Sequence, residues 1–183
     1  MQSPEDVQLH PKLIVVSGQG GSGKTTLAHR LAAAIGCPAI CRDEIKEGMV
    51  HAYGPGFVAE TSDPLTQRTF PLFFDCVRLL LAGGVTVVAE AAFQHKLWVQ
   101  GLTPLRGLAE VRVVRCSAPD EVLLERRHRR LAEVATRSAH ADSGTLHALP
   151  AWDAIHLDVP TLDVDTTDEY RPGLAALADF ANG

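Results

Sequence analysis

Residues 18–26 read GQGGSGKTT, between an apolar run, LIVVS at residues 13–17, and a helix-forming stretch, LAHRLAAAIG at residues 27–36. They satisfy the pattern G-x-x-x-x-G-K-[ST], whose fixed positions are occupied by Gly18, Gly23, Lys24 and Thr25. Glycines allow the backbone to point several N–H groups inward, which makes a cradle for an anion, and the following helix adds the positive end of its dipole. A strand before the loop and a helix after it are the context that this motif requires. The stretch therefore predicts a loop that holds the phosphates of a nucleoside triphosphate.

The polar residues of this loop have distinct predicted tasks. The ammonium of Lys24 would bridge the terminal phosphates and the hydroxyl of Thr25 would bind Mg²⁺, so we expect ATP and Mg²⁺ as cofactors. The other residues expected to contact phosphates are Gly18, Gly20, Gly21, Ser22, Gly23 and Thr26. A GTPase would carry a guanine-recognition motif of the N-K-x-D type, which this sequence lacks. That absence alone does not decide between ATP and GTP.

The composition narrows the class of protein. A chain of 183 residues suits one domain, so we expect a single domain over residues 1–183. With 46% hydrophobic and 21% charged residues, it has the balance of a soluble globular protein. The net charge of -5 makes nucleic acid an unexpected partner, because general binders carry a broad basic face. No apolar run reaches the ~20 residues that span a bilayer, and residues 1–12 do not resemble a signal peptide, so we expect a cytoplasmic protein without a membrane partner.

Strand patterns alternate with helix patterns along the chain. Apolar runs predict strands over residues 12–17, 38–41, 85–90, 111–116 and 161–165. Helical patterns fall over residues 24–35, 43–49, 65–82, 94–108, 117–135 and 170–181. Asp43 is expected to cap the second helix, and Ser117 with Asp120 the fifth. The alternation, together with the glycine loop, predicts an α/β fold of the P-loop NTPase type, in which a five-stranded parallel sheet has helices on both faces. A small lid is expected near residues 126–145.

Two acidic residues are expected at the carboxyl edge of this sheet, where ligands of α/β proteins bind. Asp43 follows the second strand, and its carboxylate could take a proton from an acceptor hydroxyl as well as cap a helix. Glu90 ends the apolar run VTVVAE. A carboxylate is costly to bury without a partner, so we predict a functional place for Glu90, with contact to Mg²⁺.

Five stretches of the chain form a recurring set: GQGGSGKTT, RDEIKEGM, VVAEAAF, CSAPDEVLLERRHRR and DVDTTDEY. In these stretches the chain resembles the small P-loop kinases that include chloramphenicol phosphotransferase-like proteins, zeta-toxin-like kinases and related AAA-type ATP-binding proteins. The resemblance implies that Asp43 is the general base for the acceptor hydroxyl, and that Asp165 and Thr166 lie near the base of the nucleotide. For Asp165 and Thr166, a turn at the end of a strand is the alternative. The family more often has aspartate at the position of Glu90.

Arginines are concentrated in the segment ERRHRR at residues 125–130. On a helix, Arg126, Arg129 and Arg130 share one face. Taken alone, this pattern fits a solvated basic face equally well. The resemblance implies instead that arginines of a lid close over the phosphates. Arg130 is then the catalytic candidate, and Arg126 and Arg137 would contact the nucleotide.

These expectations together favour an ATP- and Mg²⁺-dependent kinase that transfers the γ-phosphoryl group to a hydroxyl of a small molecule such as an antibiotic, a nucleoside or a sugar. A kinase of polynucleotide ends or of nucleotide-sugars is one alternative. An ATP-binding regulatory switch that transfers no phosphate is another. Nothing in the sequence marks an interface, so no oligomeric state is predicted.

Overall fold

The computed structural model describes residues 9–60, 63–133, 139–140, 149 and 151–183. In chain order its elements are β1 (Lys12–Gly18), α1 (Lys24–Ile35), β2 (Ala39–Cys41), α2 (Arg42–Tyr53), α3 (Pro64–Ala82), β3 (Val87–Glu90), α4 (His95–Leu102), the 3₁₀ helix η2 (Thr103–Gly107), β4 (Glu110–Ser117), α5 (Asp120–Glu133), β5 (Thr161–Asp165) and α6 (Leu174–Asn182). None of the helices in these ranges is long and apolar enough to cross a membrane.

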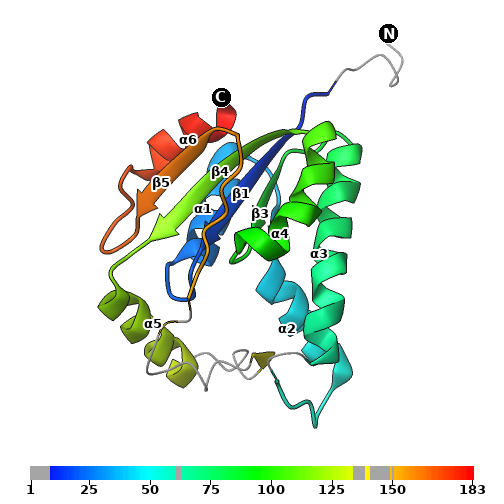
Figure 1. Cartoon of the computed structure of the whole chain (residues 1–183), viewed down its shortest axis with the longest axis vertical. Coiled ribbons are helices and arrows are strands. Elements are labelled where there is room, and N and C mark those ends of the chain that lie inside the picture. Colours follow the sequence, from blue (N-terminus) through cyan, green and yellow to red (C-terminus); the bar gives the residue numbers. More distant parts are fainter. Residues whose placement is uncertain (1–8, 61–62, 134–138, 141–148, 150) are drawn as a thin grey trace.

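The strands form a parallel five-stranded sheet in the order β2-β3-β1-β4-β5 (Figure 1). β1 lies in the middle, where Val15 pairs with Ala89 of β3 and with Val113 of β4. The continuous apolar run of β1 explains this place, because a central strand of a parallel sheet is covered on both faces. The predicted α/β fold of the P-loop NTPase type is confirmed, and each strand lies within two residues of its predicted bounds.

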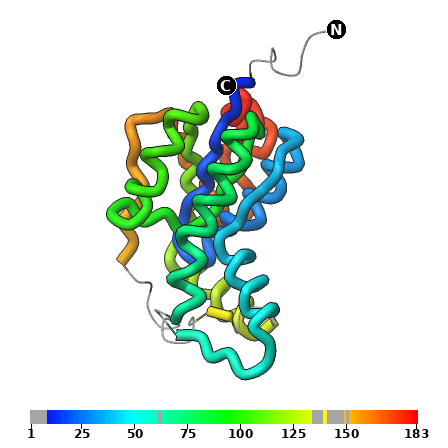
Figure 2. The backbone as a smooth tube through the Cα atoms, turned by 90° about the vertical axis from the view of Figure 1, so that its right-hand side faces the viewer, coloured from blue at the N-terminus to red at the C-terminus, as the bar shows by residue number. Residues whose placement is uncertain are grey.

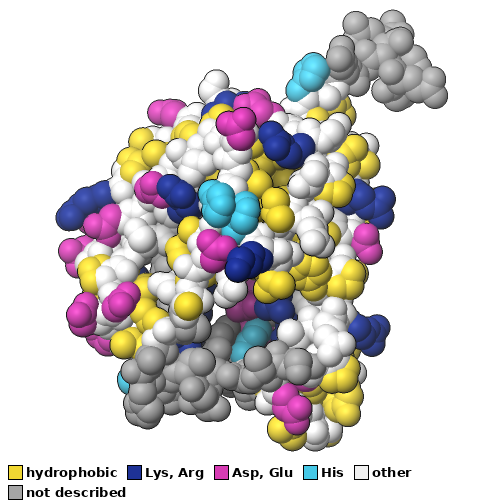
Figure 3. Space-filling model, in the orientation of Figure 1, with side chains coloured by type: hydrophobic (Ala, Val, Ile, Leu, Met, Phe, Trp, Pro, Cys, Tyr) yellow, Lys and Arg dark blue, Asp and Glu magenta, His cyan; other side chains and the backbone are white. Residues whose placement is uncertain are grey.

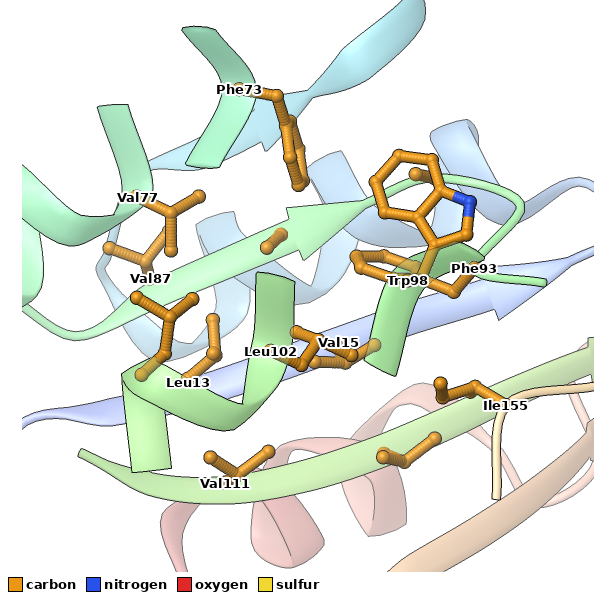
Figure 4. Close-up of a cluster of buried hydrophobic side chains, with 14 of the residues drawn as sticks. Leu13, Val15, Phe73, Val77, Val87, Phe93, Trp98, Leu102, Val111 and Ile155 are labelled. Atoms are coloured by element: carbon orange, nitrogen blue, oxygen red, sulfur yellow. The ribbon is translucent and has the colours of Figure 1, made fainter. Parts of the chain in front are cut away.

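Side chains of β1 alternate between two hydrophobic clusters. Leu13 and Val15 join the cluster that α3 and α4 cover, in which Trp98 packs against the sheet (Figure 4). Ile14 and Val16 join the opposite cluster, which α1 and α6 cover. All four β1 side chains are completely buried, and each such burial contributes about 1.5–3 kcal/mol. The sheet therefore has helices on both faces, as predicted.

Because the strands run parallel, their carboxyl ends meet at one edge of the sheet. There Glu90 of β3 pairs in register with Val16 of β1 and with Cys41 of β2. On the other side of β1, Ser117 of β4 pairs with Asp165 of β5. Residues at or just after these strand ends are thus brought together from distant parts of the sequence.

The opposite edge of the sheet joins the start of β1 to the end of α6. The Lys12 ammonium donates a hydrogen bond to the carbonyl oxygen of Asn182, and Arg112 Nη1 donates to that of Phe180 over 3.0 Å. In Figure 2 the end of α6 (red) lies next to the start of β1 (dark blue). This edge lies at the far end of the strands from Glu90, so it takes no part in the site described below.

The prediction that Asp43 caps α2 is wrong. The helix begins at Arg42, with Cys41 at the N-cap position, so Asp43 already lies in the first turn. Asp63 is the aspartate that caps a helix, because its Oδ1 accepts from the backbone N–H of Thr66 over 2.8 Å at the start of α3.

The predicted capping pair of Ser117 and Asp120 is also absent. Ser117 is the last residue of β4, and α5 begins only at Asp120. Two other helices are shorter than predicted. The helix expected up to residue 108 ends at Leu102 and continues as the 3₁₀ helix η2, and the last helix begins at Leu174 rather than residue 170.

Candidate nucleotide-binding and phosphoryl-transfer site

The loop between β1 and α1 depends on glycine. Gly21 and Gly23 have φ angles of +91° and +73°, a region that other residues rarely adopt. A Cβ atom at Gly21 would stand 2.5 Å from the carbonyl oxygen of Leu123 in α5, and one at Gly18 would stand 2.7 Å from that of Cys116. The loop is thus packed against α5 and β4 closely enough to exclude side chains, which fixes the shape of the predicted phosphate cradle.

The hydroxyl of Ser22 is a buried polar group in this loop. The residue is 1% exposed, and its Oγ has no hydrogen-bond partner among the described residues. Buried hydroxyls normally have a partner, and an oxygen of a bound phosphate would supply one. Together with the N-terminus of α1 and the ammonium of Lys24, this group makes the loop fit a triphosphate.

Lys24, Thr25 and Glu90 meet where α1 begins beside the end of β3. The Thr25 hydroxyl donates to Glu90 Oε2 over 3.1 Å, and the Lys24 ammonium lies 3.7 Å from Glu90 Oε1. The side chains of Lys24 and Glu90 are only 9% and 2% exposed. Mg²⁺ takes oxygen ligands, so the Thr25 hydroxyl and the Glu90 carboxylate could hold this ion where the phosphate loop joins α1.

Burial raises the pKa of Glu90 above its ordinary value. The charge of Lys24 lowers this pKa, the charge of Asp43 raises it, and hydrogen bonds from Thr25 and Cys41 lower it, without cancelling the effect of burial. The charged form of Glu90 is therefore favoured only with positive charge beside it. Asp43 follows Cys41 by two residues, and Cys41 pairs in register with Glu90, so both carboxylates lie at the same edge of the sheet.

Asp43 comes from the first turn of α2, just past the end of β2. Its Oδ1 accepts from Arg42 Nη1 over 3.1 Å, and its side chain is 31% exposed. The Nε atom of Arg42 is buried and has no hydrogen-bond partner within the described part of the chain. A partly exposed aspartate beside the phosphate loop can accept a proton from a bound hydroxyl. The structure brings Asp43 to the same edge as Glu90, and its role as a base stays a prediction.

A cavity of about 590 Å³ opens beside the phosphate loop, between α5 and the segment that follows β5. Its lining consists of Gly21, Gly23, Thr26, Arg30, Arg126, Arg129, Arg130, Glu133, Thr166, Asp168, Glu169, Tyr170, Gly173 and Leu174. The volume lies within the range of about 300–1,000 Å³ that is typical of small-molecule sites. Three arginines of α5 thus line the same cavity as the loop, and the contact of Arg126 and Arg130 with phosphates stays a prediction.

Arg126 is held by backbone carbonyl groups. Its Nη2 donates to the carbonyl oxygens of Thr166 and Thr167 over 2.6 and 2.7 Å, and its Nη1 donates to that of Gly21 over 3.4 Å. The side chain therefore links α5 to the phosphate loop and to the turn after β5. It fixes one wall of the cavity as well as lining it.

Thr166 and Asp165 differ in their contacts. The Thr166 hydroxyl donates to the carbonyl oxygens of Ser22 and Ser117 over 2.8 and 3.0 Å, so this residue lies against the phosphate loop. Asp165 does not line the cavity, and its Oδ1 accepts from the backbone N–H of Thr167 over 2.8 Å. For Asp165 the geometry is that of a turn at the end of a strand.

Arg30 and Tyr170 line the cavity but were not predicted from the sequence. The Arg30 guanidinium lies 5.4 Å from the centre of the Tyr170 ring, which is a cation–π distance. Arg30 follows Thr26 by four residues, a spacing that places both on one face of α1 and could have indicated it. Tyr170 carries no comparable local signal.

The predicted lid can be placed only in part. Residues 126–133 belong to α5, whereas residues 134–138, which include Arg137, and residues 141–145 lie outside the described residues. Within the lid, His140 Nε2 is 3.2 Å from Glu47 Oε1 of α2, and Ala139 is buried. This contact joins the lid segment to the helix that carries Asp43.

The sequence matches the family model of an AAA domain over residues 13–151. The chain belongs to this AAA domain family. The matched range includes the phosphate loop, Asp43, Glu90 and α5. None of the curated proteins compared with this AAA domain matches it.

Solved structures with the same fold include several phosphotransferases. A candidate kinase from Chloroflexus aurantiacus J-10-fl has a TM-score of 0.79 and 25% identity, with 96% of this chain and 98% of that chain covered. The APS kinase CysC of Mycobacterium tuberculosis, solved with AMPPNP and APS, has a TM-score of 0.65 and 13% identity, with 97% and 100% covered. A chain of the Pnkp1/Rnl/Hen1 RNA repair complex has a TM-score of 0.57 and 17% identity, with 86% of this chain and 53% of that chain covered. The predicted resemblance to small P-loop kinases is confirmed.

Proposed function

We propose that this AAA domain protein is an ATP- and Mg²⁺-dependent kinase that transfers the γ-phosphoryl group to a hydroxyl of a small molecule. The observation that carries the proposal is the contact of Glu90 with both Lys24 and Thr25, with Asp43 near it at the same edge of the sheet. A protein that only held a nucleotide would need the loop and the ion, but no second carboxylate beside them.

In the proposed reaction, the acceptor oxygen attacks the γ-phosphorus while the bond from that phosphorus to the β,γ-bridging oxygen breaks, so that ADP leaves. The acceptor proton passes to the carboxylate of Asp43. Lys24 and Arg130 offset the negative charge that develops on the phosphoryl oxygens. Thr25 and Glu90 would hold Mg²⁺, which supplies further positive charge to the phosphates. Positioning and electrostatics account for most of the acceleration.

Charge and similarity support a small acceptor. The net charge is -5, and on the face shown in Figure 3 basic side chains are interspersed with acidic ones rather than gathered into a field. The similar fold of an APS kinase also supports this class. A polynucleotide end is the second candidate, because the fold is shared with an RNA repair complex.

Mass spectrometry of a mixed panel tests the acceptor class. The protein is incubated with ATP, Mg²⁺, antibiotics, nucleosides, sugars and a single-stranded RNA with a free 5′ hydroxyl. We expect one small compound to gain a phosphoryl group, and the Lys24→Ala variant to leave it unmodified. Phosphorylation of the RNA alone would favour the polynucleotide alternative.

The Asp43→Asn variant tests whether Asp43 is the base that takes the proton of the acceptor hydroxyl. We expect it to bind nucleotide like the wild type and to lose about 10²–10⁴ in transfer rate. Asp75→Asn is the matched control, because Asp75 on α3 is 64% exposed and forms an ion pair with the similarly exposed Arg78, away from the site. Transfer that survives unchanged in Asp43→Asn would exclude this residue as the base. If the wild-type protein binds nucleotide but transfers phosphate to none of the compounds, the regulatory switch would be favoured.

A further inference from the structure

Three side chains with metal-binding atoms converge beside the first turn of α2. His29 comes from α1, Cys41 ends β2 and Glu44 lies in the first turn of α2. Their ligand atoms all lie within 4.8 Å of one another. Cys41 Sγ is 3.6 Å from His29 Nε2, which is 2.6 Å from Glu44 Oε1. The fold thus places an imidazole nitrogen, a thiol sulfur and a carboxylate oxygen together from three elements.

The donor set selects a class of metal. Thiol sulfur and imidazole nitrogen are typical ligands of Zn²⁺ and related transition metals, whereas Mg²⁺ and Ca²⁺ take oxygen ligands. Thr25 and Glu90 offer oxygen atoms only, so the two clusters suit different ions. Cys41 nevertheless connects them, because it pairs in register with Glu90 in the sheet while its Sγ belongs to the cluster with His29 and Glu44.

The spacing of these atoms fits a tetrahedral metal after small side-chain rotations. With metal–ligand distances of about 2.0–2.3 Å, the ligand atoms of a tetrahedral site stand roughly 3.3–3.7 Å apart. The 3.6 Å between Cys41 Sγ and His29 Nε2 already meets this requirement. His29 and Glu44 must separate slightly, and their side chains, 50% and 47% exposed, have the room to do so. Cys41 is held in place by its pairing with Glu90 in the sheet.

An ordinary ion pair does not account for the whole cluster. An exposed pair of His29 and Glu44 would contribute about 0–1 kcal/mol and requires no third partner. Here the pair stands against the sulfur of Cys41, a residue that is 2% exposed. Burial raises the pKa of the Cys41 thiol well above its ordinary value, and Glu90 and Glu44 raise it further, so a bound metal must displace a proton.

We propose that His29, Cys41 and Glu44 form a binding site for Zn²⁺ or a transition metal of similar softness, with a fourth position left for water. Three protein ligands and one open position are a common arrangement at zinc. Metal binding at this site is independent of the proposed kinase function, because no nucleotide or acceptor takes part in it.

Titration of the full chain with Co²⁺ in the absence of nucleotide tests the site, because a cobalt–thiolate bond gives a near-ultraviolet charge-transfer band. We expect a band that saturates at one Co²⁺ per chain, disappears when Zn²⁺ is added, and persists in a large excess of Mg²⁺. Binding should also release at least one proton, measured in weakly buffered solution.

Variants assign the band to these residues. Cys41→Ser should abolish it, and His29→Ala and Glu44→Gln should each weaken binding by about tenfold or more. Cys37→Ser is the matched control, because Cys37 is a partly buried cysteine near β2 that lies outside the cluster, and it should leave the band unchanged. Since Cys41 is buried, folding of Cys41→Ser is checked by circular dichroism. If this variant does not fold, the His29→Ala and Glu44→Gln variants test the metal site instead. The absence of a band in the wild type, or unchanged affinity in His29→Ala and Glu44→Gln, would overturn the proposal.

Discussion

Glu90 shows at the scale of one residue how the end of a strand becomes a site. Its carboxylate is almost completely buried, which in an apolar environment costs several kcal/mol unless the charge is paired. The parallel sheet places this carboxylate beside the start of α1, where Lys24 and Thr25 supply a cation and a hydroxyl. The sequence predicted that Glu90 has a partner, because burying a carboxylate at the end of an apolar strand is costly without one.

Replacing Glu90 by Gln should reveal whether this carboxylate serves a metal ion. The amide keeps the size and can still accept from Thr25, but it lacks the charge that draws Mg²⁺. We expect the rate of ATP-dependent transfer to fall by about a hundredfold or more, and the Mg²⁺ concentration for half-maximal rate to rise. A Mg²⁺ titration of the rate measures both.

The control for this substitution is Glu110→Gln at the opposite edge of the sheet, where the side chain is 50% exposed. It should leave the rate and its Mg²⁺ dependence unchanged. A Glu90→Gln variant with the Mg²⁺ dependence of the wild type would show that the ion does not bind at Glu90.

Gly21→Ala should damage the phosphate loop. The substitution places a Cβ atom 2.5 Å from the carbonyl oxygen of Leu123 at a φ of +91°, and the left-handed conformation alone costs about 1–2 kcal/mol. We expect a lower free energy of unfolding and a weaker affinity for ATP, measured by urea denaturation and by nucleotide titration. Gly48→Ala in α2 is the matched control, because among the described residues its added Cβ meets nothing within 4 Å apart from its neighbours in the same helix. It should instead stabilise the helix by up to about 1 kcal/mol.

At the scale of elements, a buried ion pair fixes the start of α3 against α2. The Lys46 ammonium lies 2.8 Å from Asp63 Oδ2, and both side chains are 3% exposed. Asp63 also caps α3 through the backbone N–H and the hydroxyl of Thr66. One carboxylate thus accepts from three donors of two helices, and α2 is the helix that carries Asp43.

Stability should therefore depend on Asp63 in a pH-dependent manner. Burial raises the pKa of Asp63, but hydrogen bonds from Lys46 and Thr66 together lower it well below the ordinary value of 3.8. A lowered folded-state pKa gives stability that is present in full above the unfolded-state pKa and is lost as the pH falls toward the folded-state value. Asp63→Asn leaves Lys46 without its counter-charge, so we expect a loss of about 3–5 kcal/mol at pH 7.

Urea denaturation between pH 7 and pH 3 measures this dependence. The difference in free energy of unfolding between the wild type and Asp63→Asn should be constant down to about pH 5 and shrink below about pH 4. Asp75→Asn serves as the control, since both side chains of its ion pair are more than half exposed and it should show a difference near zero. A difference that does not change with pH would mean that the pKa of Asp63 is the same in the folded and the unfolded protein.

Helix starts were less predictable than strands because capping is decided by tertiary contacts. Asp43 and Asp63 both stand before helical patterns, yet only Asp63 caps, since Arg42 already has helical conformation after the short strand β2. Ser117 looked like a cap but pairs in register with Asp165, and this strand contact extends β4 by one residue beyond its prediction. The strands themselves follow from continuous apolar runs, which need no knowledge of the partner strand.

Some features of the site could be predicted from the sequence and others could not, for the same reason. The phosphate loop could be predicted because its function depends on consecutive residues between a strand and a helix. The carbonyl contacts of Arg126 and the place of Tyr170 could not, because each joins elements that are distant in the sequence. The cluster of His29 with Cys41 joins consecutive elements, and it depends on how α1 packs beside β2.

At the scale of the whole molecule, hydrogen bonds to backbone carbonyls join three parts of the nucleotide cavity. Arg126 donates to Gly21 in the loop and to Thr166 and Thr167 after β5, and the Thr166 hydroxyl donates to Ser22. The loop, α5 and the end of β5 are therefore one connected wall. A ligand that binds this wall should stabilise the entire fold, and at one hundred times its dissociation constant the gain is about 2.7 kcal/mol.

Arg126→Ala should weaken this coupling between nucleotide binding and stability. The variant removes three hydrogen bonds to carbonyl groups, so we expect a lower Tm without nucleotide and a smaller rise in Tm at a fixed, saturating concentration of ATP and Mg²⁺. Thermal denaturation with and without nucleotide measures both quantities. Arg78→Ala on the exposed face of α3 is the control and should behave like the wild type. A variant with a lowered Tm but an unchanged rise on adding ATP would show that Arg126 supports the fold without shaping the nucleotide site.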